Sequence, residues 1–266
     1  MDNKTESSPG TALVTGASSG IGEEYANQLA SRGYDLIVVA RRKELLNTLA
    51  ERWRTRGGVR VEVWPADLSK DEDIADIAGR ISARDDLTLL VNNAGFGAGG
   101  PYARIEWKPQ MDMIHVHIAA TARLTKAVLP QMLERNRGAI INVSSVAAFS
   151  VLAKRTMYNS TKGWINAFSQ GIAEELRGTN VRIQAFCPGF TVTGFHGTPD
   201  MKNFDRKQIP RFLWTTSEKA VAASLRALKR KKVVFVPGLL NKIMAAAPRT
   251  PLIGRPMARL VARKKV

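Results

Sequence analysis

Short apolar runs alternate with longer amphipathic segments along most of this chain of 266 residues. The runs have the length of buried strands, and the segments between them have the length and period of helices. This alternation predicts a single α/β domain with a doubly wound parallel sheet of about seven strands and helices on both faces. The expected strands are Thr11–Thr15, Tyr34–Ala40, Val59–Trp64, Leu87–Val91, Ala139–Ser144, Val181–Cys187 and Val233–Val236. The expected helices are Glu23–Arg32, Arg41–Arg56, Ser69–Arg84, Trp107–Leu133, Met157–Arg177 and Ser217–Lys229.

A glycine-rich turn follows the first expected strand. Gly16, Gly20 and Gly22 allow the backbone to turn tightly, and a helix begins directly after them. The amide groups at a helix N-terminus bind phosphate, so this turn predicts a dinucleotide site. The same residues also match the nucleophile elbow of a hydrolase, with Ser18 as the nucleophile. We favour the dinucleotide site because that elbow normally follows a later strand.

Two arginines follow the second strand, where a dinucleotide site recognises the adenosine ribose. An acidic residue at this point would bind the ribose 2′-hydroxyl, but the chain has Arg41 and Arg42. Guanidinium groups pair well with phosphate, and cations are disfavoured at a helix N-terminus. The pair therefore predicts the phosphorylated cofactor, NADPH/NADP+.

A tyrosine and a lysine stand four residues apart on the helix expected over Met157–Arg177. Tyr158 and Lys162 then share one helix face. The ammonium group is expected to lower a phenol pKa that is otherwise about 10, so that the phenol can pass a proton near neutral pH. Ser145 ends an apolar run upstream and is suited to hold a substrate oxygen. Taken alone, the pair also fits an ordinary helix surface.

Together these motifs resemble the short-chain dehydrogenase/reductase family, which implies a Rossmann-type fold. The motifs are Thr15–Gly22, Asn92–Gly95, Ser145, Tyr158-x-x-x-Lys162 and Pro188-Gly189-x-x-x-Thr193. The resemblance covers about residues 11 to 236. Within the family, the segments Val39–Arg42 and Phe235–Lys242 are similar to a bacterial-type branch, which is similar to enzymes that reduce 3-oxoacyl or steroid-like ketones.

The resemblance implies a role for each matching residue. Tyr158 would be the general acid, Lys162 would lower its pKa and bind the nicotinamide ribose, and Ser145 would hydrogen-bond the substrate carbonyl. The implied cofactor-binding residues are Gly16, Ser18, Ser19, Gly20, Ile21, Gly22, Arg41, Arg42, Asp67, Leu68, Asn93, Ala94, Gly95, Tyr158, Lys162, Pro188, Gly189, Thr191 and Thr193. The resemblance also implies a homodimer or homotetramer.

One position departs from the family pattern. The family usually has an asparagine in the middle of the long helix, where it holds a water that leads to the lysine, and this chain has His117. Histidine can donate and accept hydrogen bonds, so His117 could be a titratable catalytic member of the relay. It could equally be a helix histidine without a catalytic part. In the first case, we expect His117→Asn to remain active with a shifted pH profile.

Apolar residues around the expected site indicate an apolar, fairly large ketone, such as an acyl chain or a fused ring. A lid is expected over residues 194–216 because family enzymes bind substrate under this segment. The expected substrate-binding residues are Phe96, Phe149, Leu152, Phe195, Phe212 and Trp214. Any one of them could instead pack in the core. Three histidines and one cysteine form no metal set.

The formal net charge of +17 is concentrated towards the C-terminus, where no acidic residue follows Glu218. We divide the chain into a flexible segment 1–10, a catalytic domain 11–237 and a basic, apolar tail 238–266. The tail could be a solvated surface, could rest on an anionic membrane, or could bind an acidic carrier protein or the phosphates of coenzyme A. Nucleic acid is a weaker option, because the tail lacks aromatic stacking residues.

No run of about 18 apolar residues is present, and Cys187 is the only cysteine. We therefore expect a cytoplasmic protein, with peripheral membrane contact left open. The expected activity is NADPH-dependent reduction of a ketone to a secondary alcohol. Two alternatives stay open: an alcohol dehydrogenase that works in the oxidative direction, and a non-catalytic sensor or scaffold that binds the cofactor.

Overall fold

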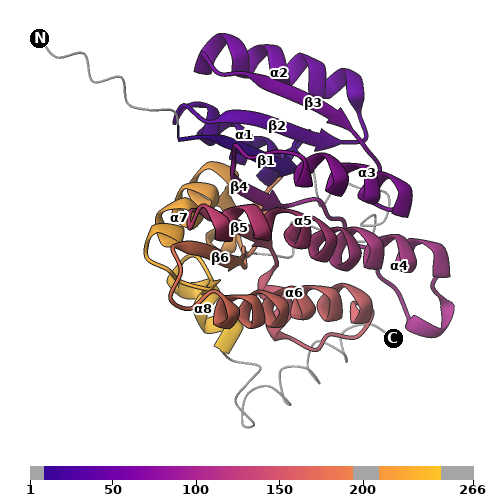
Figure 1. The fold of residues 1–266 in the computed structure, drawn as a ribbon. Coiled ribbons are helices and arrows are strands. Elements are labelled where there is room, and N and C mark those ends of the chain that lie inside the picture. Colours follow the sequence, from indigo (N-terminus) through magenta and orange to yellow (C-terminus); the bar gives the residue numbers. More distant parts are fainter. Residues whose placement is uncertain (1–8, 194–209, 247–266) are drawn as a thin grey trace, which may run out of the picture.

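A parallel sheet of seven strands runs through the centre of the molecule, in the order β3-β2-β1-β4-β5-β6-β9 (Figure 1). The computed structural model describes residues 9–193 and 210–246. The strands are β1 (Thr11–Thr15), β2 (Asp35–Ala40), β3 (Val61–Pro65), β4 (Leu87–Asn92), β5 (Gly138–Val143), β6 (Val181–Phe186) and β9 (Val234–Phe235). This sheet confirms the expected doubly wound fold, and each strand lies within two residues of its expected start.

Helices cover both faces of the sheet because the strands send alternate side chains to opposite sides. In β1, Ala12 and Val14 join one buried cluster and Leu13 joins the other. The first cluster includes residues of α1 (Gly20–Ala30), α2 (Lys43–Gly57) and α7 (Ser217–Lys229). The second includes residues of α3 (Asp71–Ser82), α5 (Ala120–Glu134) and α6 (Thr156–Glu175).

The order of the strands positions the loops that matter for function. The chain builds β1, β2 and β3 towards one edge, then crosses over to place β4 on the other side of β1. The chain therefore leaves the carboxyl ends of β1 and β4 towards opposite faces of the sheet. In open α/β sheets, ligands bind at such a point. Sequence positions more than seventy residues apart meet there, since Val14 pairs with Val91.

The long helix expected over Trp107–Leu133 is interrupted. A regular helix, α4, spans Trp107–Ile114, a π-helical turn spans His115–Ala119, and α5 follows from Ala120. A π turn accommodates an extra residue and often marks a functional position. Here it contains His117, whose side chain is fully buried.

Several smaller elements were not expected from the sequence. Thr191–Val192 (β7) pairs in parallel with Thr215–Thr216 (β8), and Val146–Phe149 forms a 3₁₀ turn, η3. A last helix, α8 (Leu239–Ala246), packs against η3. None of the helices in the described ranges has the length and apolar character that a membrane crossing requires. Residues 1–8, most of the expected lid and most of the expected tail lie outside the described residues.

Candidate functional site

The glycine-rich turn lies against the loop that follows β4. Gly16 has a φ of +66°, and a Cβ atom there would lie 2.8 Å from Asn93 Nδ2 and 2.9 Å from Ala94 Cα. A Cβ atom on Gly22 would collide with the Asn93 side chain and the Gly16 carbonyl. The turn therefore requires both glycines: a side chain at either position would push the two loops apart.

A threonine at the end of β1 joins these two loops. Thr15 Oγ1 accepts hydrogen bonds from the backbone amides of Asn93 at 2.9 Å and Ala94 at 3.0 Å. In return, Asn93 Nδ2 donates to the Thr15 carbonyl at 2.8 Å. The loop after β4 is thus held in register with the turn after β1. Thr15 was in the matched motif, but its clamping role could not be read from the sequence.

The two arginines after β2 have different partners. Arg42 Nη2 donates to the carbonyl of Ser18 at 3.2 Å and to its hydroxyl at 2.9 Å, so this guanidinium lies over the glycine-rich turn. Arg41 is exposed. Partial burial raises the pKa of Asp67, but hydrogen bonds from Ser69 and the charge of Arg41 outweigh it and hold that pKa below its ordinary value. Two cations and one carboxylate therefore surround the end of the second strand.

The other expected residues of this half of the site lie in varied surroundings. Ser19 is exposed immediately before α1, and Ile21 packs against the first buried cluster. Leu68 is buried beside Val116 and Ala94. Thr193 lies against Gly20, where a Cβ atom would come within 3.1 Å of the Thr193 side chain.

Lys162 enters the site from α6 and is almost completely buried, with 4% of it exposed. Its Nζ donates to the Val143 carbonyl at 2.9 Å and lies 5.9 Å from the centroid of the Tyr158 ring. A Cβ atom on Gly95 would come within 3.4 Å of this Nζ and within 2.8 Å of His117 Nε2. The missing side chain of Gly95 therefore leaves room for both groups.

The hydrogen bonds of His117 define its tautomer. The backbone amide of Phe96 donates to His117 Nε2 at 3.3 Å, so this nitrogen carries no proton. His117 Nδ1 then donates to Thr161 Oγ1 at 2.9 Å, and the Thr161 hydroxyl donates to the Tyr158 carbonyl at 3.0 Å. Both ring nitrogens are thus engaged in holding the β4 loop and α6 together.

Burial governs the charge of His117 and Lys162. It holds the pKa of His117 well below its ordinary value near 6.5, and the nearby charge of Lys162 lowers it further. Burial also lowers the pKa of Lys162 to about 7. The structure therefore does not bear out the expectation that His117 adds a group that titrates in the working pH range.

The structure does not bear out the lowered pKa that the sequence predicts for Tyr158. Burial raises the pKa of Tyr158, and a hydrogen bond with Ser145 and the charge of Arg155 offset only part of that rise. Ser145 Oγ also accepts from the Ala147 amide at 3.1 Å, which caps η3 and fixes the serine. The arrangement thus joins a serine hydroxyl to a neutral phenol.

The loop after β6 closes the other end of the site. The Val146 amide donates to the Pro188 carbonyl at 3.0 Å, and Thr191 Oγ1 donates to the Gly189 carbonyl at 3.1 Å. Asn241 of α8 packs so tightly on Gly189 that a Cβ atom there would collide with its amide. Asn241 lies in the segment Phe235–Lys242, whose sequence resembles the bacterial-type branch, but its contact with Gly189 could not be predicted from that resemblance.

The expected substrate-binding residues do not all come together. Phe96 lies 6.1 Å from His117, measured between ring centroids. Phe149 and Leu152 lie between Ser145 and Tyr158 in the sequence, and both are partly buried. Trp214 packs on Phe190 at 5.5 Å. Phe212 is 71% exposed, and Phe195 lies outside the described residues.

Comparisons with known proteins agree with this geometry. A family model described as short chain dehydrogenase matches residues 10–202. A very-long-chain 3-oxoacyl-CoA reductase of Anas platyrhynchos is 34% identical over 187 residues, which are 68% of this chain and 60% of that protein. This chain therefore corresponds to only part of that relative.

Two solved structures are similar over nearly the whole chain. A short-chain dehydrogenase from Sphingobium yanoikuyae in complex with NADPH is 32% identical, with a TM-score of 0.82 and coverage of 97% of this chain and 96% of its own. The bulky-bulky ketone specific alcohol dehydrogenase from Comamonas testosteroni is 29% identical, with a TM-score of 0.78 and the same coverage.

The depressed pKa of His117 makes a prediction about stability. Below about pH 6.5 the unfolded chain binds a proton at this residue that the folded protein does not bind, so stability falls as the pH falls. When the pH is lowered from 8 to 5, the unfolding free energy of the wild type should fall by up to about 2 kcal/mol more than that of His117→Asn. Urea unfolding across this range measures the difference, and His117→Gln should behave like His117→Asn. If the unfolding free energies of the wild type and the variants change with pH in parallel, His117 is not buried in its neutral form.

Proposed function

The chain belongs to the short-chain dehydrogenase/reductase family, and we propose that it reduces an apolar ketone to a secondary alcohol with NADPH. The observation that carries this proposal is the meeting of two parts at one edge of the sheet. Ser145 follows β5, and Tyr158 and Lys162 lie in α6. The glycine-rich turn follows β1, and Arg42, which lies over that turn, follows β2.

The residues present fit a dinucleotide with a 2′-phosphate. Gly16 and Gly22 let the turn pack closely against the loop of Asn93, and α1 begins directly beyond the turn without a side-chain cap on its N-terminus. Arg42 is held over that turn by Ser18, and Arg41 stands exposed beside it. Two guanidinium groups suit a phosphate dianion. The similarity to an NADPH-bound dehydrogenase from Sphingobium yanoikuyae supports the same cofactor.

Proton transfer is the part of the reaction that this chain would supply. NADPH would provide the hydride for the carbonyl carbon. Tyr158 would donate its hydroxyl proton to the carbonyl oxygen, and Ser145 would hydrogen-bond that oxygen. A raised pKa keeps Tyr158 protonated before the step. The protonated form of Lys162, whose pKa is about 7, would then stabilise the phenolate that forms.

His117 would act as a positioning residue in this scheme. Its ring nitrogens hold the Phe96 amide and the Thr161 hydroxyl, which lies one turn from Tyr158 and next to Lys162. The imidazole would thus fix the separation between the β4 loop and α6. It would stay neutral while it does so, since burial disfavours its charged form.

An apolar substrate follows from the side chains around the reactive groups. Phe96 lies beside His117, and Phe149 and Leu152 belong to the chain segment that runs from Ser145 to Tyr158. Similarity to a very-long-chain 3-oxoacyl-CoA reductase and to a bulky-bulky ketone specific alcohol dehydrogenase supports a large ketone. The intact catalytic trio argues against a non-catalytic scaffold. Cells keep NADP largely reduced, which argues against the oxidative direction.

We also propose that α8 and the basic residues after it rest on an anionic membrane surface. Leu239, Leu240 and Ile243 of α8 are exposed by 73%, 45% and 55%. Lys242 is exposed among them, and the chain beyond α8 contains cations but no acidic residue. Apolar side chains interleaved with cations are the composition of a segment that binds anionic lipid.

Tyr158→Phe tests the catalytic proposal. With a panel from short ketones to 3-oxoacyl thioesters and steroid ketones, NADPH oxidation by the wild type should exceed that of the variant by about 10²- to 10⁴-fold, because the proton donor is lost. Absorbance of NADPH measures the rate, and binding of NADPH should be retained. Equal rates for both proteins with every ketone would disprove the reductase.

Arg42→Gln tests the choice of cofactor. Loss of a guanidinium that faces the 2′-phosphate should raise the KM for NADPH by at least about tenfold, and the KM for NADH should change little. Lys43→Gln is the matched control, since it removes one exposed neighbouring cation and should leave both values nearly unchanged. If Arg42→Gln raises the KM for NADPH and the KM for NADH by the same factor, the arginine does not bind the 2′-phosphate.

Co-sedimentation with vesicles tests the membrane contact. Leu239→Ser/Ile243→Ser should reduce partition into anionic vesicles by at least about tenfold, because two apolar side chains no longer enter the lipid. Leu133→Ser, at an apolar residue of α5 that is 43% exposed, is the control and should bind like wild type. Unchanged partition of the double variant would exclude α8 as the anchor.

A further inference from the structure

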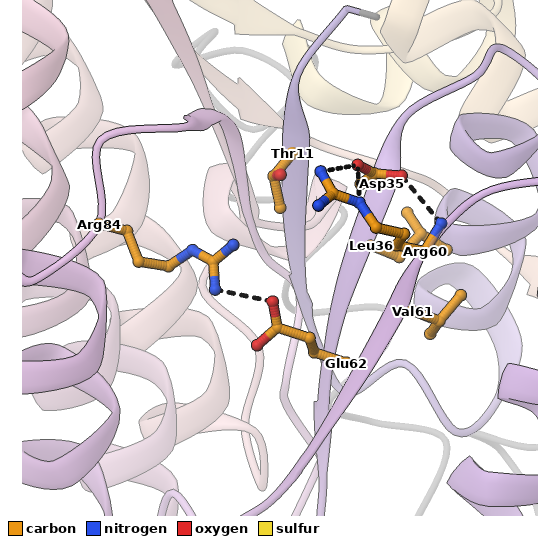
Figure 2. A pocket seen from close by; sticks show the side chains of 7 residues that line it. All are labelled: Thr11, Asp35, Leu36, Arg60, Val61, Glu62 and Arg84. Atoms are coloured by element: carbon orange, nitrogen blue, oxygen red, sulfur yellow. Dashed lines mark hydrogen bonds and ion pairs between the residues drawn. The ribbon is translucent and has the colours of Figure 1, made fainter.

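Two recesses open at the amino edge of the sheet, opposite the edge that holds Tyr158. The smaller has a volume of about 110 Å³ and is shown in Figure 2. Its two arginines have carboxylate partners: Arg60 pairs with Asp35 at 2.6 Å, and Arg84 pairs with Glu62 at 2.7 Å. The charges of this recess are therefore balanced by its own residues.

The larger recess has a volume of about 450 Å³ and a different charge. It lies between the C-terminal ends of α1 and α7 and the amino ends of β4, β5 and β6. Its lining includes the cations Arg32, Arg137, Arg182, Arg226 and Lys229. No aspartate or glutamate is among the described residues that line it. Cations from four separate segments thus converge on one cavity without a carboxylate.

These cations also have no ion-pair partner elsewhere in the part of the chain that the structure describes. No salt bridge within residues 9–193 and 210–246 involves any of them. Arg137 donates to the Pro9 carbonyl at 3.2 Å, and Arg32 donates to Gln28 at 3.2 Å. Arg182 Nε is buried and has no hydrogen-bond partner among the described residues. A buried donor in this state is costly, so the guanidinium of Arg182 is incompletely satisfied by the described residues.

Helix dipoles account for only some of the charge. Arg226 and Lys229 lie in the last turn of α7, where cations are favoured by the helix C-terminus. Arg182 lies in β6 and not at a helix end, whereas Arg137 follows the end of α5, where its amide donates to the Met132 carbonyl at 3.0 Å. Like charges that converge repel one another, which makes an unfilled arrangement unfavourable.

We propose that this cavity binds a small organic molecule that carries a phosphate group on an apolar body. Guanidinium groups bind phosphate through paired, charge-assisted hydrogen bonds, and four of the five cations are arginines. The remaining lining includes Leu29, Leu89, Leu225 and Leu228, which suit an apolar body. The volume falls within the range of small-molecule sites. This site is separate from the reductase site at the opposite edge.

Isothermal titration of the full chain with 1-naphthyl phosphate tests the proposal. The wild type should bind this probe, and 1-naphthol, which has the same body without the phosphate, should bind at least about tenfold more weakly. Arg137→Gln/Arg182→Gln should weaken binding of the phosphate at least about tenfold. Arg56→Gln/Lys126→Gln changes the net charge equally at exposed residues outside the cavity and should bind like wild type.

Thermal unfolding without the probe separates a ligand site from a structural role. If the cations serve a ligand, the Arg137→Gln/Arg182→Gln variant should unfold at the same or a higher temperature, because repulsion is relieved. Should this variant fail to fold, Arg32→Gln/Arg226→Gln, at two exposed positions of the same cavity, takes its place.

Three results would overturn the site. The first is an absence of binding by the full chain. The second is equal weakening in the control variant. The third is a lower unfolding temperature with unchanged binding. Binding to phosphatidate vesicles identifies the source of the phosphate. If the wild type binds the vesicles and the cavity variant does not, the phosphate belongs to a lipid headgroup. If the wild type does not bind them, the ligand is a soluble molecule.

Discussion

The pairing of β1 with β4 is the contact on which the candidate active site depends. It brings the glycine-rich turn beside the loop of Asn93 and Gly95, and the Thr15 hydroxyl then joins the two backbones. Gly95 in turn leaves the space that His117 and Lys162 occupy. A single strand pairing therefore sets the distance between the part of the site suited to a dinucleotide and the part suited to proton transfer. Without it, the two halves of the chain would hold incomplete sites.

Burial, rather than direct pairing of charges, dominates the electrostatics at this edge. Lys162 has no carboxylate partner among the described residues, and its ammonium is bound by the Val143 carbonyl. Its pKa of about 7 places it near the middle of its titration at neutral pH, so a nearby negative charge can shift its protonation readily. The neutral His117 beside it adds no competing charge. The site is thus poised to respond to charge that develops on Tyr158.

The sheet and the glycine turn could be predicted because they depend on local signals: apolar, β-branched runs and glycines in sequence order. The π turn could not, because Ile114–Ala119 reads as ordinary helix, and its shifted geometry accompanies contacts of His117 with Phe96 and Thr161, far away in the sequence. The lowered pKa predicted for Tyr158 was wrong for a similar reason, because burial raises it. Helical spacing shows that Lys162 is near, but it does not show how deeply each group is buried. The roles of the site residues that match the family motifs remain predictions from the resemblance.

Helix α8 has a consequence for how the protein is made. Asn241 packs on Gly189 and donates to the Pro237 carbonyl, and β9 pairs with β6 just before it. The Pro188–Gly189 end of the site therefore receives its support from residues that leave the ribosome after almost all of the sheet has been synthesised. A nascent chain can form the glycine-rich turn early, but it completes the opposite wall only once residue 246 has emerged. Asn241 thus joins the last described helix to the Pro188–Gly189 end of the site.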